Sequence, residues 1–273
     1  SWSKTSFRSG AAGDLANQFS GARRNMARYQ VILAYDGADF FGFQRQADGC
    51  GQRTVQGVVE QALRRIGWQG RAILFAGRTD VGVHASGQVI AFDLDWLHST
   101  DALLAALNAN LPADVAAQAA QLAADDFHPR YDARARCYRY RLFCQPRRDP
   151  LRERYAWRVW PEVDGARMQR AAAHLIGTHD FAAFGSPPRR KGVTLRTVYQ
   201  AQWSPEPPDG WIFEVSANAF LFHMVRRMVG LLVAIGQGKQ EVEAVLNYLQ
   251  NPNGAKLRTL APAHGLTLVE VIY

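Results

Sequence analysis

The chain has 273 residues, of which 48% are hydrophobic, and a formal net charge of +8. This length fits one large domain or two small domains that share a core, and the hydrophobic content excludes a wholly disordered protein. The pI of about 9.7 favours an anionic partner, although solubility alone can account for a moderate positive charge.

The first half of the chain carries alternating strand and helix signals. Residues 1–26 are rich in Ser, Gly, Ala and Arg without an apolar period, which predicts a disordered tail. A strand with the sequence RYQVILAY follows and ends at an Asp-Gly turn, and a helix begins after Thr54, its expected cap. The remaining expected elements are strands at 71–76 and 87–94, a helix at 99–108 and a strand at 115–122. The order is therefore β-α-β-β-α-β.

The second half repeats this order of elements. We expect a strand at 137–144, a helix at 164–176, strands at 195–203 and 211–217, helices at 218–235 and 240–250, and a final strand at 266–273. The pattern predicts an α+β protein with two ferredoxin-like βαββαβ halves, residues 27–132 and 133–273. Their sheets would join side by side into a mixed, mostly antiparallel sheet flanked by helices, with a ligand groove at the junction.

Residues 75–89, FAGRTDVGVHASGQV, form a glycine-rich segment between two strand-like runs. Glycines suit a tight loop that another molecule approaches closely. Thr79 and Asp80 are ordinary turn formers, so a purely local role stays open. Arg78 and Asp80 lie two apart, and in an extended segment both would point to one side, where a guanidinium keeps a carboxylate ionised.

Residues 126–143, DFHPRYDARARCYRYRLF, interleave arginines with tyrosines. Within CYRYRLF, residues 137–143, strand alternation sends tyrosines and arginines to opposite faces. An aromatic platform beside basic groups suits an unstacked base and its backbone. A half-buried strand with the tyrosines inside explains the pattern equally well.

Residues 217–230, ANAFLFHMVRRMVG, are almost continuously apolar and predict a buried helix. A buried arginine needs a carboxylate or carbonyl partner, which suggests that Arg226 faces Asp80. Either Arg226 or Arg227 could instead extend to the surface. Because His223 and both arginines interrupt the most apolar stretch, we expect no membrane span.

No pattern in the sequence indicates a nucleotide triphosphate or metal site. The GxxxxGK[ST] motif is absent. Asp80 with His84, and His174 with His179, lack the third ligand that a metal site would need. The three cysteines, an odd number at wide spacing, provide neither a disulfide framework nor a zinc motif and fit a reducing cytoplasm.

Several motifs together resemble the tRNA pseudouridine synthase A family. They run in order from about residue 28 to residue 273: YDGADFFGFQRQ, TVQGVVEQAL, GRTDVGVHASGQV, DFHPRYDARARCYRYR and NAFLFHMVRRMVG. The resemblance implies a pseudouridine synthase fold, a homodimer, and a cytoplasmic isomerase that converts uridine to pseudouridine at positions 38, 39 and 40 in the anticodon stem-loop of tRNA. Val81, Pro129 and Phe43 depart from the usual residues, which affects packing near the site rather than its charges.

The resemblance also assigns roles to individual residues. Asp80 falls on the catalytic nucleophile, Tyr138 on the tyrosine that packs on the target base, and Arg226 on the arginine that pairs with the aspartate. Arg78 could fill the space that the flipped uridine leaves. The residues expected to bind RNA are Arg45, Arg189, Arg190 and Lys191.

The expected reaction needs neither a metal nor a nucleotide cofactor, because it moves a glycosidic bond within one nucleoside without redox change or hydrolysis. Asp80 could attack the anomeric carbon or remove a sugar proton, and the sequence leaves both routes open. Two other functions also stay open. A tandem RNA-binding protein would not require Arg78, Asp80, Tyr138 and Arg226, and an Asp/His metal hydrolase would lose activity to a chelator.

Overall fold

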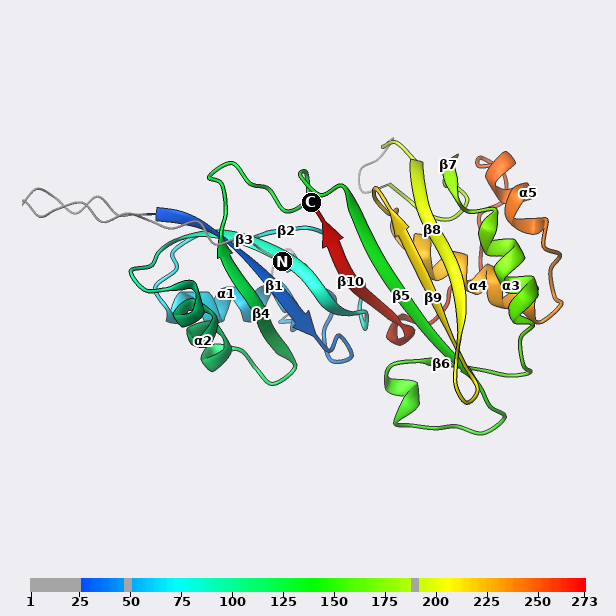
Figure 1. Ribbon diagram of the computed structural model, residues 1–273, viewed down its shortest axis with the longest axis horizontal. Helices are drawn as coiled ribbons and strands as arrows, with labels where there is room; N and C mark the ends of the chain where they lie inside the picture. The colour runs from blue at the N-terminus through cyan, green and yellow to red at the C-terminus, as the bar shows by residue number, and fades with distance from the viewer. Residues whose placement is uncertain (1–25, 47–50, 188–191) are drawn as a thin grey trace, which may run out of the picture.

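The computed structural model describes residues 26–46, 51–187 and 192–273 (Figure 1). Of the predicted tail, only Met26 lies within the described residues, and it begins the first strand. The elements of the first half are β1 (Met26–Tyr35), α1 (Val55–Arg65), β2 (Leu74–Phe75), β3 (His84–Asp95), α2 (Thr100–Asn110) and β4 (Val115–Leu122). Thr54 caps α1 as predicted, because its hydroxyl accepts a hydrogen bond from the Gly57 amide.

The second half follows the same plan with two added strands. Its elements are β5 (Ala135–Cys144), β6 (Trp157–Val159), α3 (Gly165–Ala173), β7 (Gly177–Asp180), β8 (Leu195–Glu206), β9 (Gly210–Ala217), α4 (Met224–Gly236), α5 (Ala244–Gln250) and β10 (Leu266–Ile272). Short 3-10 turns occupy Arg152–Arg154 and Ala263–Gly265. The short strands β6 and β7 are not evident in the sequence pattern.

All the strands belong to one sheet, with the order β4-β1-β3-β10-β5-β9-β8-β7. β2 pairs with β3, and β6 pairs with β5. The orders β4-β1-β3-β2 and β10-β5-β9-β8 are both the ferredoxin-like order, so the predicted fold class is confirmed. The pairings β3–β10 and β5–β6 are parallel and the rest are antiparallel, which gives the expected mixed, mostly antiparallel sheet.

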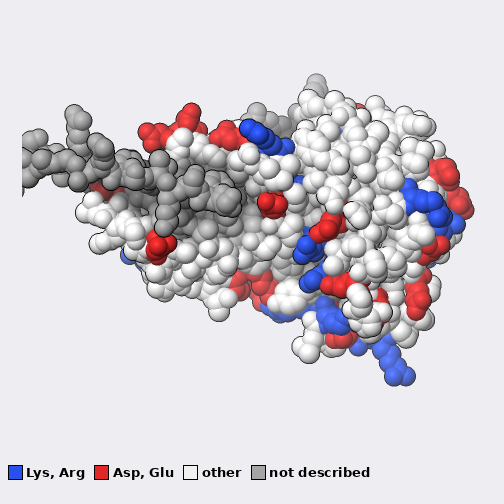
Figure 2. Space-filling view, viewed as in Figure 1, with Lys and Arg blue, Asp and Glu red and all other residues white. Residues whose placement is uncertain are grey.

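Each half has its own hydrophobic core beneath one face of the sheet. Figure 1 looks onto the open face, with α1 and α4 behind the strands. β5 shows the division well, since Tyr140 and Leu142 are fully buried and the alternating Arg139 and Arg141 pair with acidic residues on the open face. In Figure 2 this face carries intermixed basic and acidic side chains over the second half. None of the described helices is long and apolar enough to cross a bilayer.

The largest departure from the predicted elements lies at the start of α4. The sequence predicts a helix from residue 218, but α4 begins at Met224. The Asn218 side-chain oxygen accepts hydrogen bonds from the amides of Thr197 and Ala219, and this local bonding turns the chain. The prediction was wrong here because residues 219–222 are apolar for another reason: they line a cavity.

Candidate active site

The GRTD loop lies on the segment that follows β1. The Phe43 amide donates to the Thr79 carbonyl at 3.1 Å, and the hydroxyls of Tyr35 and Thr79 lie 2.8 Å apart. Gly42 has a φ of +82°, and a Cβ there would lie 2.9 Å from the Thr79 carbonyl oxygen. A side chain on Gly37 would collide with the Val83 carbonyl. The YDG and FGF motifs therefore support the loop that carries Asp80.

Asp80 forms an ion pair with Arg226, which reaches it from the first turn of α4. Arg226 Nη1 donates to Asp80 Oδ2 at 3.0 Å, and Arg226 Nε donates to the Ala261 carbonyl at 2.8 Å. The side chains of Asp80 and Arg226 are 19% and 13% exposed, so the pair is only partly screened by water. Arg227 points elsewhere and donates to the Phe184 carbonyl. The structure thus brings Arg226, rather than Arg227, to Asp80.

His223 also contacts Asp80, a contact that the sequence pattern does not predict. Its Nε2 lies 3.4 Å from Asp80 Oδ2, and its ring stacks on Phe222 with a centroid distance of 3.7 Å. Burial lowers the pKa of His223, and Arg226 and Arg227 lower it further, against the opposing effect of the Asp80 charge. A neutral imidazole at neutral pH follows. The sequence pattern does not reveal this contact, because residue 223 falls inside the predicted helix.

Tyr138 is the tyrosine of β5 that lines the same cavity as Asp80. Its ring meets Phe220 edge to face at 5.1 Å. Burial raises the pKa of Tyr138, and the charge of Asp80 adds to this, so the hydroxyl stays protonated at neutral pH. Tyr140 is fully buried and donates to the Pro262 carbonyl, as a half-buried strand with its tyrosines inside predicts. Tyr140 is a core residue, and Tyr138 faces the cavity.

Arg136 lies on the same face of β5 as Tyr138 and Tyr140, where the period of two along a strand places it. It is 9% exposed and donates hydrogen bonds to four backbone carbonyls. Nη1 reaches Asn218 at 2.8 Å and Ala133 at 3.3 Å, and Nη2 reaches Arg130 at 2.6 Å and Ala76 at 3.2 Å. Burial lowers the pKa of this guanidinium. Arg136 therefore links Ala76, the residue before the GRTD loop, to the second half of the chain.

These residues surround a cavity of about 1010 Å³ at the junction of the two halves. Among the described residues that line it, Asp80 is the only carboxylate. Six arginines line the same cavity: Arg45, Arg78, Arg130, Arg136, Arg196 and Arg226. Such a surface favours a polyanion, and a single carboxylate lies within it among the described residues.

The other sequence-predicted site residues occupy different positions. Arg78 is exposed at the cavity, and no ion pair links it to Asp80 in the described part of the chain. Arg45 lines the cavity, but its Nη1 lies 3.3 Å from the buried Glu60 carboxylate, and its guanidinium also donates to the Arg71 carbonyl. Arg189, Arg190 and Lys191 lie outside the described residues.

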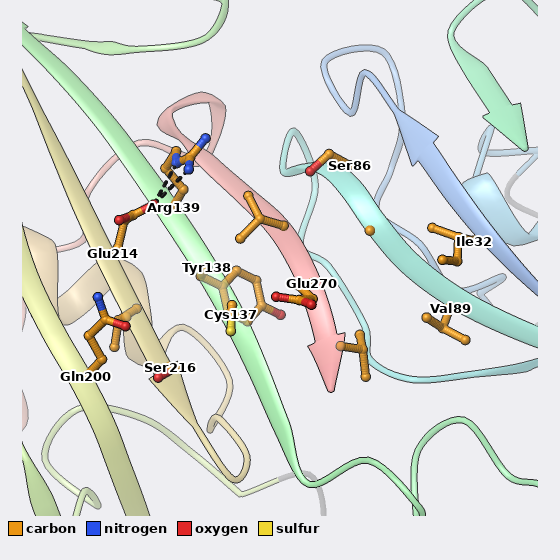
Figure 3. A pocket seen from close by; sticks show the side chains of 14 residues that line it. Ile32, Ser86, Val89, Cys137, Tyr138, Arg139, Gln200, Glu214, Ser216 and Glu270 are labelled. Atoms are coloured by element: carbon orange, nitrogen blue, oxygen red, sulfur yellow. Dashed lines mark hydrogen bonds and ion pairs between the residues drawn. The ribbon is translucent and has the colours of Figure 1, made fainter. Parts of the chain in front are cut away.

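A second hollow, of about 540 Å³, lies on the open face of the sheet, and Figure 3 shows its lining. Three consecutive residues of β5 line it, Cys137, Tyr138 and Arg139. Arg139 is bonded to Glu214 there, and Glu270 supplies a further carboxylate. Asp80 and Arg226 do not line this hollow. Over the described ranges, no group of three or more His, Cys, Asp or Glu residues could hold a metal ion.

Comparison with known proteins identifies the family of the chain. Residues 31–132 and 171–273 match the family model described as tRNA pseudouridine synthase. A tRNA pseudouridine synthase A of Streptococcus equi subsp. equi (strain 4047) is 39% identical over 250 residues, which cover 91% of this chain and 99% of the relative. The enzyme of the same name from Roseiflexus sp. (strain RS-1) is 41% identical over 253 residues, covering 92% and 91%.

A relative from Leuconostoc citreum (strain KM20), also named tRNA pseudouridine synthase A, is 37% identical over 254 residues that cover 91% of this chain and 98% of its own. Among solved structures, one titled "Crystal Structure of a Cbf5-Nop10-Gar1 Complex" matches 75% of this chain and 45% of that chain, with a TM-score of 0.33 and 13% identity, too distant to bear on function. The family match spans both halves that enclose Asp80, and the chain belongs to the tRNA pseudouridine synthase family.

Proposed function

We propose that this isomerase converts uridine to pseudouridine at positions 38, 39 and 40 in the anticodon stem-loop of tRNA, with Asp80 as its nucleophile. The observation that carries the assignment of Asp80 is the lack of any other carboxylate among the described residues around the cavity. This cavity is rich in arginine, and Arg226 holds one of the Asp80 oxygens. The family membership supplies the reaction class, and the site supplies a residue that can perform it.

The reaction breaks the bond between the ribose C1′ and base N1, turns the base, and joins C1′ to base C5. A proton then leaves C5, and one is gained at N1, so substrate and product have the same atoms. Asp80 acts either by bonding to C1′ or by removing a proton from the sugar. Both routes use the carboxylate of Asp80, and Arg226 Nη1 lies 3.0 Å from its Oδ2.

Tyr138 and Arg78 support the base and the RNA in this proposal. The target uridine must leave its stack to reach a cavity residue. The Tyr138 ring, braced by Phe220, offers an aromatic face to the detached base. Its protonated hydroxyl can donate a hydrogen bond to that base. Arg78, which is exposed and lines the same cavity as Asp80, would enter the space that the flipped nucleotide leaves.

The proposal includes a homodimer and further RNA contacts. A cavity of about 1010 Å³ accommodates the reacting nucleotide but not a whole tRNA. In a two-fold dimer, one subunit could hold the tRNA body while the other presents Asp80 to the anticodon arm. Arg45, Arg189, Arg190 and Lys191 are the proposed RNA-binding residues. Light scattering should give the dimer mass, and a fully active monomer would refute this division of labour.

The decisive experiment is Asp80→Asn, which removes the charge and keeps the shape. Transcribed tRNA carrying uridine tritiated at C5 releases tritium once per isomerisation. We expect no multiple turnover by the variant, with tRNA affinity and thermal stability close to those of the parent. Asp93→Asn is the matched control, since Asp93 also pairs with an arginine, Arg28, but does not line the cavity, and it should remain active.

Two further arms test the finer parts of the proposal. Transcripts with cytidine in place of uridine at positions 38, 39 and 40 should release no tritium, and release at the parental rate would place the reaction elsewhere. A chelator should leave activity unchanged, whereas loss of activity on adding the chelator would favour the metal hydrolase. Absence of tritium release by the parent chain would favour the tandem RNA-binding protein, and product formation by Asp80→Asn at the parental rate would refute the assignment of Asp80.

A further inference from the structure

His223 has an unusual backbone conformation for its residue type. Its φ of +65° lies in the left-handed region, and it is the only non-glycine residue with positive φ in the described part of the chain. Such a conformation persists only where the surroundings enforce it, and it clusters at functional sites. Here Phe222 and Ser186 exchange two backbone hydrogen bonds, and the His223 carbonyl accepts from the Arg227 amide at 3.0 Å. The turn is therefore fixed from both sides.

The fixed turn directs the imidazole to the carboxylate of Asp80. His223 is the residue just before α4, and Arg226 lies in the first turn of that helix. Both approach the same oxygen, Asp80 Oδ2, at 3.4 and 3.0 Å. No hydrogen-bond donor from the described residues reaches Oδ1. Asp80 Oδ2 is thus approached from two directions, whereas Oδ1 has no partner among the described residues.

We propose that His223 is a positioning residue, whose Nε2–H donates to Asp80 Oδ2 and, together with Arg226, orients the carboxylate so that Oδ1 meets the ribose. This role rests on the proposed function of Asp80. The contact is longer than an ordinary hydrogen bond, and catalytic hydrogen bonds commonly shorten as the transition state forms. Stacking on Phe222 keeps the ring in the required plane.

A neutral donor suits this position better than a second cation. The charged groups that face His223 are Asp80, Arg226 and Arg227, and burial together with the two arginines keeps the imidazole neutral at neutral pH. Arg226 already balances the single charge of Asp80. A further positive charge would weaken the carboxylate as a nucleophile or base, whereas a neutral N–H orients it with little cost in reactivity.

Three substitutions separate the imidazole from the strained backbone. His223→Gln keeps the backbone strain of a non-glycine residue at positive φ, and its side chain can place an amide nitrogen near the position of Nε2. His223→Asn tolerates the left-handed conformation, but its amide is too short to reach Asp80. His223→Gly removes the ring and all strain. His98→Asn, at an exposed histidine outside the cavity, is the control.

Steady-state tritium release from tRNA and thermal unfolding of the full chain give the two readouts. We expect kcat to fall about tenfold or more for the Asn and Gly variants, with KM unchanged, and to stay within about threefold of the parent for Gln. The Gly variant should unfold at the same temperature as the parent or higher, since its strain is gone. A structural role alone would instead lower stability and activity together.

The inference is overturned if the Asn and Gly variants keep the parental kcat, or if their loss of activity only follows a loss of stability. It is also overturned if Gln is as impaired as Gly. These outcomes are distinguishable from failure of the proposed function. If the proposed function were wrong, the parent chain itself would release no tritium from tRNA, or Asp80→Asn would remain active.

Discussion

Replacing Arg136 by Met should destabilise the protein and loosen the GRTD loop. Arg136 is buried, and its guanidinium donates to four carbonyls that belong to different segments. Each such bond contributes roughly 1–1.5 kcal/mol net, and the relief of burying a charge offsets part of the sum, so we expect a loss of about 3 kcal/mol. For a chain of this size that corresponds to a fall of roughly 6–12 °C in Tm.

Urea and thermal unfolding, followed by tryptophan fluorescence, measure this loss. Arg139→Met is the matched control, since Arg139 lies on the same strand but pairs with Glu214 where both side chains are about 40% exposed, at 41% and 42%. An exposed ion pair contributes about 0–1 kcal/mol, so the control should change little. Because Arg136 also holds the Ala76 carbonyl, kcat should fall in the Met variant under conditions where it remains folded. Equal stability losses for the two variants would refute this account of Arg136.

Three other predictions address the base platform, the RNA contacts and acid stability. Tyr138→Phe should keep more activity than Tyr138→Ala, because the aromatic face survives, and parental kinetics for both would make Tyr138 only a core residue. Neutralising Arg189, Arg190 and Lys191 together should reduce the slope of log affinity for tRNA against log salt, and an unchanged slope would place the RNA elsewhere. Burial lowers the pKa of His84 below its ordinary 6.5, so the folded state binds fewer protons and stability should fall as pH drops through and below 6.5. His84→Gln should reduce the difference between urea midpoints measured at pH 7 and pH 5, and an unchanged difference would assign the acid sensitivity to other groups.

Elements with a clear local signal were predictable from the sequence. The Thr54 cap set the start of α1, and the strand at 115–122 agrees with β4 because its boundaries coincide with turns. The start of α4 was not predictable from composition, because residues 219–222 are as apolar as the helix itself. Their apolar character serves the cavity wall, and the turn depends on Asn218 contacts with Thr197, which is distant in the sequence.

The site shows the same division between local and tertiary information. The expected contact of Arg226 with Asp80 follows from the general need of a half-buried arginine for an anionic partner. Strand alternation places Arg136 on the face of the tyrosines, but its hydrogen-bond partners do not follow from the sequence, because they are carbonyls of segments that meet only in the folded chain. His223 was hidden for a similar reason, since a left-handed histidine has no sequence signature.

The candidate site and the junction between the halves depend on the same contacts. Direct strand pairing between the halves is short, with Thr267 opposite His84 and Leu268 opposite Ala85. Asp80 belongs to the loop just before β3, whereas the Arg226 that binds it comes from α4 of the other half. The hydrogen bond from Arg136 to the Ala76 carbonyl is a second link between the halves beside the same loop. Neither half therefore contains a complete site. A substitution that separates β3 from β10 should also move Asp80 away from Arg226, even if the substituted residue lies on the open face of the sheet.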